Sequence, residues 1–596
     1  MNGKTKSLAG IWEKSGNEPR HFFFWLMLLS PVVYVMALLM VGFAGNPPPF
    51  SKWFALAGLV GFFIGVPAFV LSWIPPLRQW FTRLLRHKLL VFAGLVTLIA
   101  LFYAVENWRG RTAWNHFRRE WEARGVEFAL DKIVPPPIPE AENMYEAEPW
   151  RGFHFIRSGG ILFENTNIQS EVWFDITGPK RREAPEGTDL FLARQVKLEE
   201  WQNFYRGTNN QFTSAGGGLT NYFPVAAAPQ TPAQDVLLAL SKFEDRLNQI
   251  RTAAQRPKAR FWVNYEDGFG ALIPHLAKFK SIATYLRLRS TALLADGQTD
   301  AAFDDLMLAF RLDKALQDEP ILISHLVRIA VLQVNLSTLW EGLASHRWTD
   351  AQLAAFEAEL AGIDVLAEYQ NGMNGERYFS MWCVDFLYRT GDLNSIGGSA
   401  EPGNYSLGDQ LIAANNKATF HLIPRGWFDQ NKVSLGKMHV DYIRPMVDVE
   451  KQLVPPANLR RTSAAMSSYR PTPYNLFAGL LLPALEGASK KSAVAQTYVN
   501  FARIACALER YRLANGNYPE ALDVLAPKFI SKLPHDVING QPLKYRRNAD
   551  GSFVLYSVGW NETDDGGQVV RLTNKNGKEG GVDQDKGDWV WQLPKR

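Results

Sequence analysis

Three long apolar runs near the N-terminus are the clearest feature of the hydrophobic pattern. Phe22 to Ala44 and Trp53 to Ile74 contain no charged residue, and each is long enough to cross the roughly 30 Å hydrocarbon core of a bilayer as a helix. Leu89 to Val105 is shorter, close to the minimum spanning length, and lies between Lys88 and Glu106. The pattern predicts three transmembrane helices within residues 21–108, after a tail at residues 1–20.

The distribution of Lys and Arg predicts the orientation of these helices. Basic residues are frequent before the first run and between the second and third, whereas only Lys52 lies between the first and second. We therefore expect a multi-pass protein of the cell (inner) membrane with a cytoplasmic N-terminus and an extracytoplasmic C-terminal region. If Leu89 to Val105 lay in the interface instead of crossing, the C-terminal region would be cytoplasmic. No run contains Asp, Glu, Lys, Arg or His, which favours an anchor over a transport path.

The next two segments have a mixed pattern. Residues 109–149 predict a juxtamembrane helix and a stiff Pro-rich linker. The aromatic residues of that helix suit either the membrane interface or packing on the protein itself. Residues 150–230 alternate in short pieces cut by Gly, Pro and Asn, which predicts a β-containing, loop-rich segment. The aromatic positions are Trp114, Phe117 and Trp121, and the alternating pieces are Gly160 to Phe163, Glu171 to Ile176 and Leu190 to Ala193.

Helical periodicity begins at Thr231 and predicts a helical domain over residues 231–390. Thr231 to Gln234 and Thr349 to Gln352 match the capping-box pattern at helix starts. Between them the pattern predicts helices from Pro274 to Ala295, from Thr299 to Leu316 and onward from Pro320. Stacked helical hairpins of the tetratricopeptide type and an irregular helical domain both fit. Residues 391–475 are predicted to be loop-rich.

Residues 476–596 predict a helix followed by a β-hairpin. An apolar stripe runs along Ala493 to Asn515, and Gly516 is a typical residue for ending that helix. After a short turn at Glu520 to Leu525, the runs Leu543 to Arg547 and Ser552 to Val558 alternate as strands around a Gly-containing turn. The predicted fold class is therefore an α+β membrane protein with three N-terminal helices, a mainly helical extracytoplasmic region and this C-terminal α/β module.

Composition narrows the range of partners. The chain has 596 residues and a formal net charge of +5, without a basic block, so we expect no nucleic-acid partner. Its length suggests several folded units. The only two cysteines, Cys383 and Cys506, could form a disulfide in an oxidising compartment or remain as two buried thiols.

Candidate chemistry is sparse. The chain lacks the Gly-x-Ser-x-Gly, His-Glu-x-x-His, Cys-x-x-Cys and phosphate-loop motifs. Glu266 and Asp267, with His275, are the nearest approach to an acid–base cluster. Such carboxylates could serve a hydrolase if one were buried, but an acidic pair before a helix is also an ordinary solvated cap.

Acidic residues in two C-terminal loops form a candidate calcium site. Oxygen ligands in glycine-rich loops suit a hard cation such as calcium, although two solvated turns would have the same composition. The candidate ligands are Asn561, Asp564, Asp565, Asp583, Asp585 and Asp588.

Several short motifs in this region occur in the order found in a known family. The phrases ALERYRLANGNYPEAL, LPHDVINGQPLKY, FVLYSVG and DDGG resemble the globular domain of type II secretion major pseudopilins, over roughly the last hundred residues. The resemblance implies calcium binding in the loop after the strand that carries Ser557 and Gly559, with Asp564 and Asp565 on the family's pattern.

These features together favour a non-enzymatic, membrane-anchored protein of the cell envelope. We expect a binding or scaffolding role with a protein partner, linked to secretion. The alternatives are an envelope hydrolase that uses carboxylate acid–base chemistry and a subunit of a membrane transport complex.

Overall fold

The computed structural model describes most of the chain after residue 87. The described residues are 88–153, 156–158, 161–163, 173–178, 184–207, 222–391, 420, 422–481, 485–573 and 579–594, with a few isolated positions before 88. Apart from such isolated positions, the predicted membrane helices Phe22 to Ala44 and Trp53 to Ile74 lie outside the described residues. The described part is mainly helical with some antiparallel strands, which confirms the α+β class.

The chain divides into two compact units. Unit 1 comprises Met1–Phe117 and Cys383–Lys432, and unit 2 comprises Arg118–Trp382 and Val433–Arg596. The boundaries fall inside three helices, α5 (Lys88–Glu122), α15 (Val365–Thr390) and α17 (Arg425–Met438). The C-terminal module, which the sequence predicts to begin at residue 476, belongs to the same unit as the central helices.

In unit 1, α5 contains the third apolar run and continues past it without a break. The predicted juxtamembrane helix is therefore the second half of the same helix. The first half of α5 exposes most of its large apolar side chains, whereas Glu106 and Gly110 are buried. The exposed side chains are Leu90, Phe92, Leu95, Val96, Leu98, Ile99, Leu101, Phe102 and Val105.

A close contact joins α5 to α17 within unit 1. A Cβ atom added at Gly110 would clash with the backbone of Gly426, and one added at Gly426 would clash with the carbonyl of Glu106. The backbone N–H of Gly426 donates to Asn107 Oδ1 at 2.9 Å, and Trp427 Nε1 donates to Glu106 Oε2 at 2.9 Å. Only glycine allows backbones to approach this closely.

Two helices among the described residues are long and apolar enough to cross a membrane. In the segment Leu90–Glu122 of α5, the apolar stretch is almost entirely exposed. In α13 (Leu322–Ala344), by contrast, two thirds of the apolar stretch is buried inside unit 2, as expected of a core helix.

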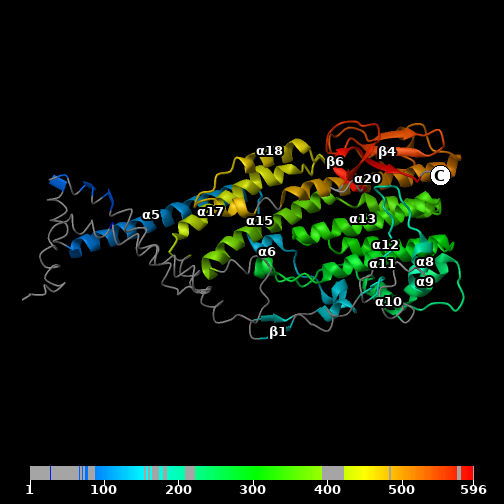
Figure 1. The fold of residues 1–596 in the computed structure, drawn as a ribbon, viewed down its shortest axis with the longest axis horizontal. Helices are drawn as coiled ribbons and strands as arrows, with labels where there is room; N and C mark the ends of the chain where they lie inside the picture. The colour runs from blue at the N-terminus through cyan, green and yellow to red at the C-terminus, as the bar shows by residue number, and fades with distance from the viewer. Residues whose placement is uncertain are drawn as a thin grey trace, which may run out of the picture. The chain divides into compact units, whose positions relative to one another are not determined.

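Unit 2 is built on rows of helices around α13, shown in green in Figure 1. α13 packs against α11, α12 and α20, and α11 also packs against α9 and α12. Leu336, Leu339 and Trp340 of α13 are fully buried. The remaining helices before α15 are α6 (Leu130–Ile133), α8 (Leu198–Arg206), α9 (Pro232–Leu240), α10 (Glu244–Ala253), α11 (His275–Ala295), α12 (Thr299–Lys314) and α14 (Asp350–Ala361).

The predicted capping box is complete at the start of α14, and one of its two hydrogen bonds is present at the start of α9. Thr349 and Gln352 form both hydrogen bonds of a capping box at the start of α14, and the Thr231 side chain accepts from the Gln234 N–H at the start of α9. Gly297 has a φ of 80° between α11 and α12. The helices of the two hairpins differ in length, from 12 to 23 residues, which favours the irregular helical domain over a regular repeat.

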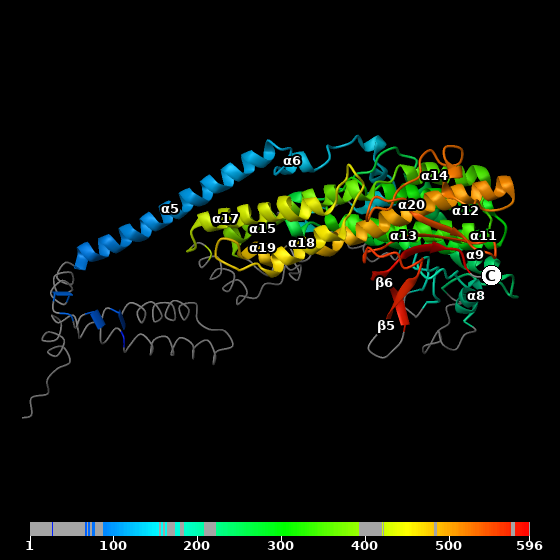
Figure 2. The same cartoon turned by 90° about the horizontal axis from the view of Figure 1, so that it is seen from above.

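The C-terminal part adds α20 and two small sheets. Figure 2 shows α20 beside α14 and α13, with β5 and β6 projecting from one side of the unit. One sheet has the strand order β3-β4-β7 and the other pairs β5 with β6, all antiparallel. The predicted hairpin is confirmed as β3 and β4. The elements are α18 (Pro456–Ser467), α19 (Leu476–Leu481), α20 (Glu486–Asn515), η12 (Leu522–Leu525), β3 (Lys544–Arg547), β4 (Phe553–Ser557), β5 (Val569–Thr573), β6 (Glu579–Gly587) and β7 (Trp589–Gln592).

α20 is buried more completely than its apolar stripe predicts. The stripe residues are buried, and so are the alanines and several polar residues on the other faces. The cause is packing on several sides, against α13, α14, α18 and the sheet. Trp340 Nε1 donates to the Gln592 carbonyl at 2.9 Å, and Tyr498 Oη donates to the Val590 carbonyl at 3.1 Å. These bonds tie β7 to the helices.

The structure differs from the sequence prediction in three respects. Leu190 to Ala193 forms a turn, and the described residues 173–176 of the piece Glu171 to Ile176 contain no strand either, although β1 (Ile156–Ser158) and β2 (Ile161–Phe163) do form a short hairpin. α8, which buries Trp201 and Phe204, was missed. The segment predicted as loop-rich after residue 391 contains α17 and α18.

Both cysteines are buried and free, so the two-thiol alternative holds.

Candidate functional site: a basic pocket in unit 2

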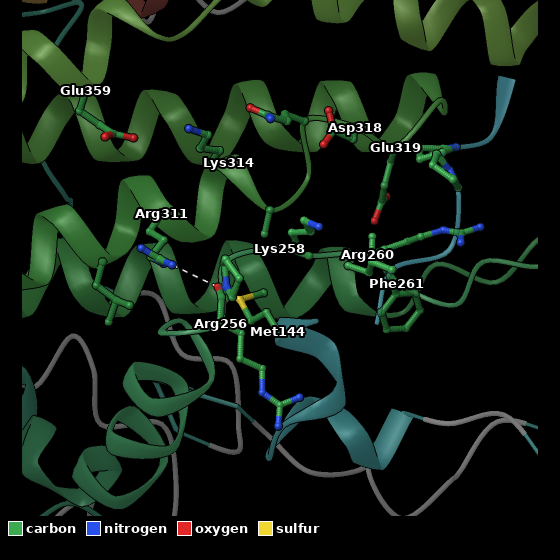
Figure 3. A pocket seen from close by; sticks show the side chains of 18 of the residues that line it. Met144, Arg256, Lys258, Arg260, Phe261, Arg311, Lys314, Asp318, Glu319 and Glu359 are labelled. Carbon is green, nitrogen blue, oxygen red and sulfur yellow. Dashed lines mark hydrogen bonds between the residues drawn. The ribbon is translucent and has the colours of Figure 1, made fainter. Parts of the chain in front are cut away.

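A pocket of about 610 Å³ lies within unit 2 (Figure 3). Its walls come from the Pro-rich linker, from the segment 256–261 before α11, from the end of α12 and from the connection between α12 and α13. Apolar side chains line much of it, namely Pro135, Pro136, Ile138, Met144, Phe261, Tyr265, Met307 and Leu308. This size and lining are typical of sites for small molecules.

Positive charge dominates the polar part of the lining. Five basic side chains face three carboxylates. Arg256 donates to the carbonyls of Glu140 and Asn143, both at 2.9 Å, and Arg311 donates to the carbonyl of Arg256 at 3.1 Å. Because carbonyl oxygens carry no net charge, these bonds leave the positive charge of both guanidinium groups uncompensated. The basic residues are Arg256, Lys258, Arg260, Arg311 and Lys314, and the carboxylates are Asp318, Glu319 and Glu359.

The remaining three cations differ in their partners. Lys258 forms an ion pair with Glu142 at 2.7 Å. The side chains of Arg260 and Lys314 have no hydrogen-bond or ion-pair partner among the described residues. An anion that entered the pocket would therefore meet two cations that are not already engaged.

A buried carboxyl–imidazole pair borders the same pocket. Glu319 Oε1 lies 2.7 Å from His275 Nε2, and both side chains are buried, with 8% and 0% of their surface exposed. The Phe261 ring stacks on the imidazole with ring centroids 3.8 Å apart. The other oxygen of Glu319 and Nδ1 of His275 have no hydrogen-bond partner. Both unpartnered atoms are enclosed by the surrounding residues and are not accessible from the pocket.

Two buried phenols are kept protonated near this pair. Burial and the negative charge of Glu319 raise the pKa of Tyr145, and the same two causes raise the pKa of Tyr265. Both hydroxyls are therefore neutral at physiological pH.

The predicted acid–base cluster is divided by the fold. Glu266 is exposed, and Asp267 accepts a hydrogen bond from Asn264 Nδ2 at 2.8 Å. His275 instead pairs with Glu319, which is 44 positions away in the sequence. The separation explains why the pair could not be predicted from spacing.

A serine and a histidine also meet in the core of unit 2. Ser492 Oγ lies 2.8 Å from His325 Nε2, and His325 Nδ1 has no partner. Burial, and to a lesser extent the charge of Arg328, lowers the pKa of His325 to about 3. Ser492 is completely buried, so the pair lacks the substrate access that a nucleophilic serine requires.

The first three candidate calcium ligands lie in the loop after β4. Asn561 donates to Asp565 at 2.8 Å, and Asp564 lies 3.4 Å from Lys544 and accepts from the Gly566 N–H. These bonds shape the loop and use oxygen atoms that a cation would need.

The other three candidate ligands have separate roles. Asp588 is buried and accepts from the backbone N–H groups of Asp565 and Gly567, at 3.2 and 2.6 Å. Asp585 pairs with Lys490 at 2.6 Å, and Asp583 accepts from the Asp585 N–H. Across the described ranges, no three His, Cys, Asp or Glu side chains are grouped as metal ligands. Calcium binding stays a prediction.

The basic pocket was not predicted from the sequence. One local signal was available, because Arg256, Lys258 and Arg260 alternate in the segment RPKAR after a helix. The contribution of Arg311, Lys314 and Glu319 depends on how α12 and its connection to α13 pack against that segment (Figure 3). Comparisons with family models, with characterised proteins and with solved structures find no match to this chain.

Proposed function

We propose that this protein is a membrane-anchored, non-enzymatic binding protein of the cell envelope, with unit 2 outside the cytoplasm. The observation that carries the proposal is the exposed apolar half of α5. Among its exposed side chains, Leu90, Phe92 and Leu98 have 68–70% of their surface uncovered. A continuous apolar surface of this kind is costly in water but stable in lipid.

The polar groups that line the pocket favour a binding role over a catalytic one. The pocket presents mainly cations, and the histidine beside it is already paired and stacked. A protein partner and a link to secretion are supported by the resemblance of the C-terminal residues to pseudopilins. In favour of that resemblance, the helix, short turn and hairpin that it implies follow one another in α20, η12, β3 and β4.

Membrane fractionation tests the anchor. After extraction of membranes at alkaline pH, the full chain should remain in the pellet, because integral helices resist this treatment. A variant that lacks residues 1–105 should move to the supernatant. Release of the full chain into the supernatant would contradict the proposal.

A further inference from the structure

We propose that unit 1 binds the phosphate group of an anionic phospholipid through three exposed arginines, Arg111, Arg389 and Arg425, which we call the arginine cluster. This inference rests on the membrane anchoring proposed above and names the class of lipid that the anchor recognises. Three observations carry it: the position of the arginines where the apolar half of α5 ends, their lack of acidic partners, and exposed apolar and aromatic side chains beside them.

The arginine cluster is gathered by contacts within unit 1. Gly110 of α5 meets Gly426 of α17 backbone to backbone. Arg111 follows the first of these glycines in the sequence, and Arg425 precedes the second. The guanidinium of Arg425 lies 5.5 Å from the centroid of the Tyr388 ring, and the third member of the cluster is the next residue on α15. The three arginines therefore lie near the point where the exposed apolar stretch of α5 ends.

The cluster carries positive charge that no carboxylate in the described part of unit 1 offsets. That part contains three carboxylates, and each already has a cationic partner. Glu106 pairs with Arg109 at 3.2 Å. Asp385 and Asp429 both pair with Lys432, at 3.1 and 3.0 Å. Guanidinium groups without such a partner are well suited to bind phosphate, because their planar N–H groups match its oxygens.

Exposed apolar and aromatic side chains lie beside the cluster. Trp108 is 70% exposed and comes directly after the apolar stretch of α5. Leu422 is also exposed, and its carbonyl accepts a hydrogen bond from the Tyr103 hydroxyl, which places it against the apolar half of the helix. Tryptophan and arginine at the end of an apolar helix are typical of the membrane–water interface, where lipid phosphates lie.

These neighbours favour a phospholipid over a soluble anion, because acyl chains would cover the apolar surface while the headgroup meets the arginines. An anionic lipid is favoured over a zwitterionic one because the cluster offers three cations and no free carboxylate for the ammonium group of a zwitterionic headgroup.

Native mass spectrometry of the full chain in a neutral detergent tests the proposal, since it counts bound lipids and yields their affinities. Dioleoyl phosphatidylglycerol is the anionic probe, and dioleoyl phosphatidylcholine has the same acyl chains and phosphate without the net charge. We expect the first phosphatidylglycerol to bind about tenfold more tightly than the first phosphatidylcholine. Millimolar inorganic phosphate should not displace it, because phosphate has no acyl chains.

Variants connect the binding to the named residues. Arg111→Gln, Arg389→Gln and Arg425→Gln should each weaken phosphatidylglycerol about fivefold and leave phosphatidylcholine unchanged. Arg347→Gln is the matched control, because Arg347 is an exposed arginine in the turn between α13 and α14 of unit 2 and forms no ion pair among the described residues. The control should bind both lipids as the unmodified chain does. All four side chains are exposed, so the melting temperatures should agree.

Three results would overturn the inference. The first is equal affinity of the unmodified chain for the two lipids, which does not depend on any variant. The second is equal affinity of the three cluster variants and the control for phosphatidylglycerol. The third is displacement of phosphatidylglycerol by inorganic phosphate, which would assign the cluster to a soluble anion. None of them changes the expected result of membrane fractionation, so failure of the lipid proposal is distinguishable from failure of the anchor.

Discussion

Glu376, on α15 in unit 2, is a buried carboxyl with little compensation. It is 7% exposed, and burial raises its pKa to about 7 despite a hydrogen bond from the backbone of Leu322. Because the folded-state pKa is above the unfolded value of 4.5, the folded state binds the proton more tightly. Its contribution to stability is therefore largest below pH 4.5 and is lost as the pH rises toward 7.

Replacing Glu376 with the neutral isostere should remove this dependence. At pH 8 we expect Glu376→Gln to raise the free energy of unfolding by on the order of 2–3 kcal/mol, with little effect at pH 4. Melting temperatures of the full chain at both pH values are the measurement. Glu266→Gln, at an exposed site, is the control, and an equal response of the two variants at pH 8 would contradict the assignment.

Glu509, near the end of α20, shows the opposite behaviour. Burial opposes its ionisation, but hydrogen bonds from His346, Arg512 and Tyr518 outweigh that cost and lower its pKa to about 2. The three donors lie 2.6–2.9 Å from its oxygens. A lowered carboxyl pKa stabilises the fold above the unfolded pKa of 4.5, and the stabilisation is lost as the pH falls from there toward 2.

Glu509→Gln should therefore destabilise the protein at pH 7 by about 2 kcal/mol, because His346 and Arg512 lose their anionic partner. The difference from the unmodified chain should shrink between pH 4.5 and pH 2. Thermal unfolding followed by circular dichroism measures it. A loss of stability that is the same at every pH would show that packing and not charge is responsible.

At the scale of elements, the contact between α5 and α17 depends on two glycines. Gly426→Ala should destabilise unit 1 by about 1–3 kcal/mol, since the added methyl group meets the Glu106 carbonyl of a neighbouring helix. Gly94→Ala, on the same α5 helix but with no atom within 4 Å of the added Cβ, should be tolerated. Protease resistance of the full chain in detergent compares the two, and equal resistance would rule out tight packing at Gly426.

A second prediction at the scale of elements concerns calcium binding by the acidic loops around β5 and β6. If calcium binds there, saturation at about a hundred times its dissociation constant should stabilise the fold by about 2.7 kcal/mol. The melting temperature should then rise with calcium and fall with chelator, and Asp564→Ala with Asp565→Ala should abolish the change. Asp588→Asn serves as a comparison, since it replaces one of the two oxygens that accept backbone N–H groups with an NH2 group, with or without calcium. Identical melting in calcium and chelator would mean that the loops are solvated turns.

At the scale of the whole molecule, the third apolar run decides the side of the membrane on which unit 2 lies. Leu98 is at the middle of the exposed apolar half of α5. An arginine there costs about 2.5–3.5 kcal/mol for insertion as a membrane helix. Leu98→Arg should therefore reverse the location of a C-terminal reporter, with lower alkaline phosphatase activity and higher cytoplasmic fluorescence.

Trp108→Arg is the control for this reversal, because Trp108 is exposed just beyond the apolar stretch. A reporter that is cytoplasmic in the unmodified chain would support the alternative in which Leu89 to Val105 lies in the interface. That result would contradict the extracytoplasmic location and leave membrane anchoring itself intact.

The sequence by itself determined the features that depend on neighbouring residues. Apolar periodicity and caps placed α9, α11, α12, α13, α14 and α20, and alternation around Asn548 to Gly551 placed the β3–β4 hairpin. These signals are readable because helix caps and tight turns are made within a few residues of the chain. The missed helix α8 had such a signal in Leu198, Trp201 and Tyr205, but the surrounding turn residues obscured it.

Only the tertiary structure decided which distant side chains meet. His275 paired with Glu319 and not with the nearby acids, and α20 became buried on several sides because helices and a sheet pack against it. The basic pocket likewise needed the Pro-rich linker, the 256–261 segment and α12 to converge. The local sequence pattern indicates on which side of its own helix or strand a residue lies. A site depends on contacts between elements, and these contacts are set by packing between residues that are far apart in the chain.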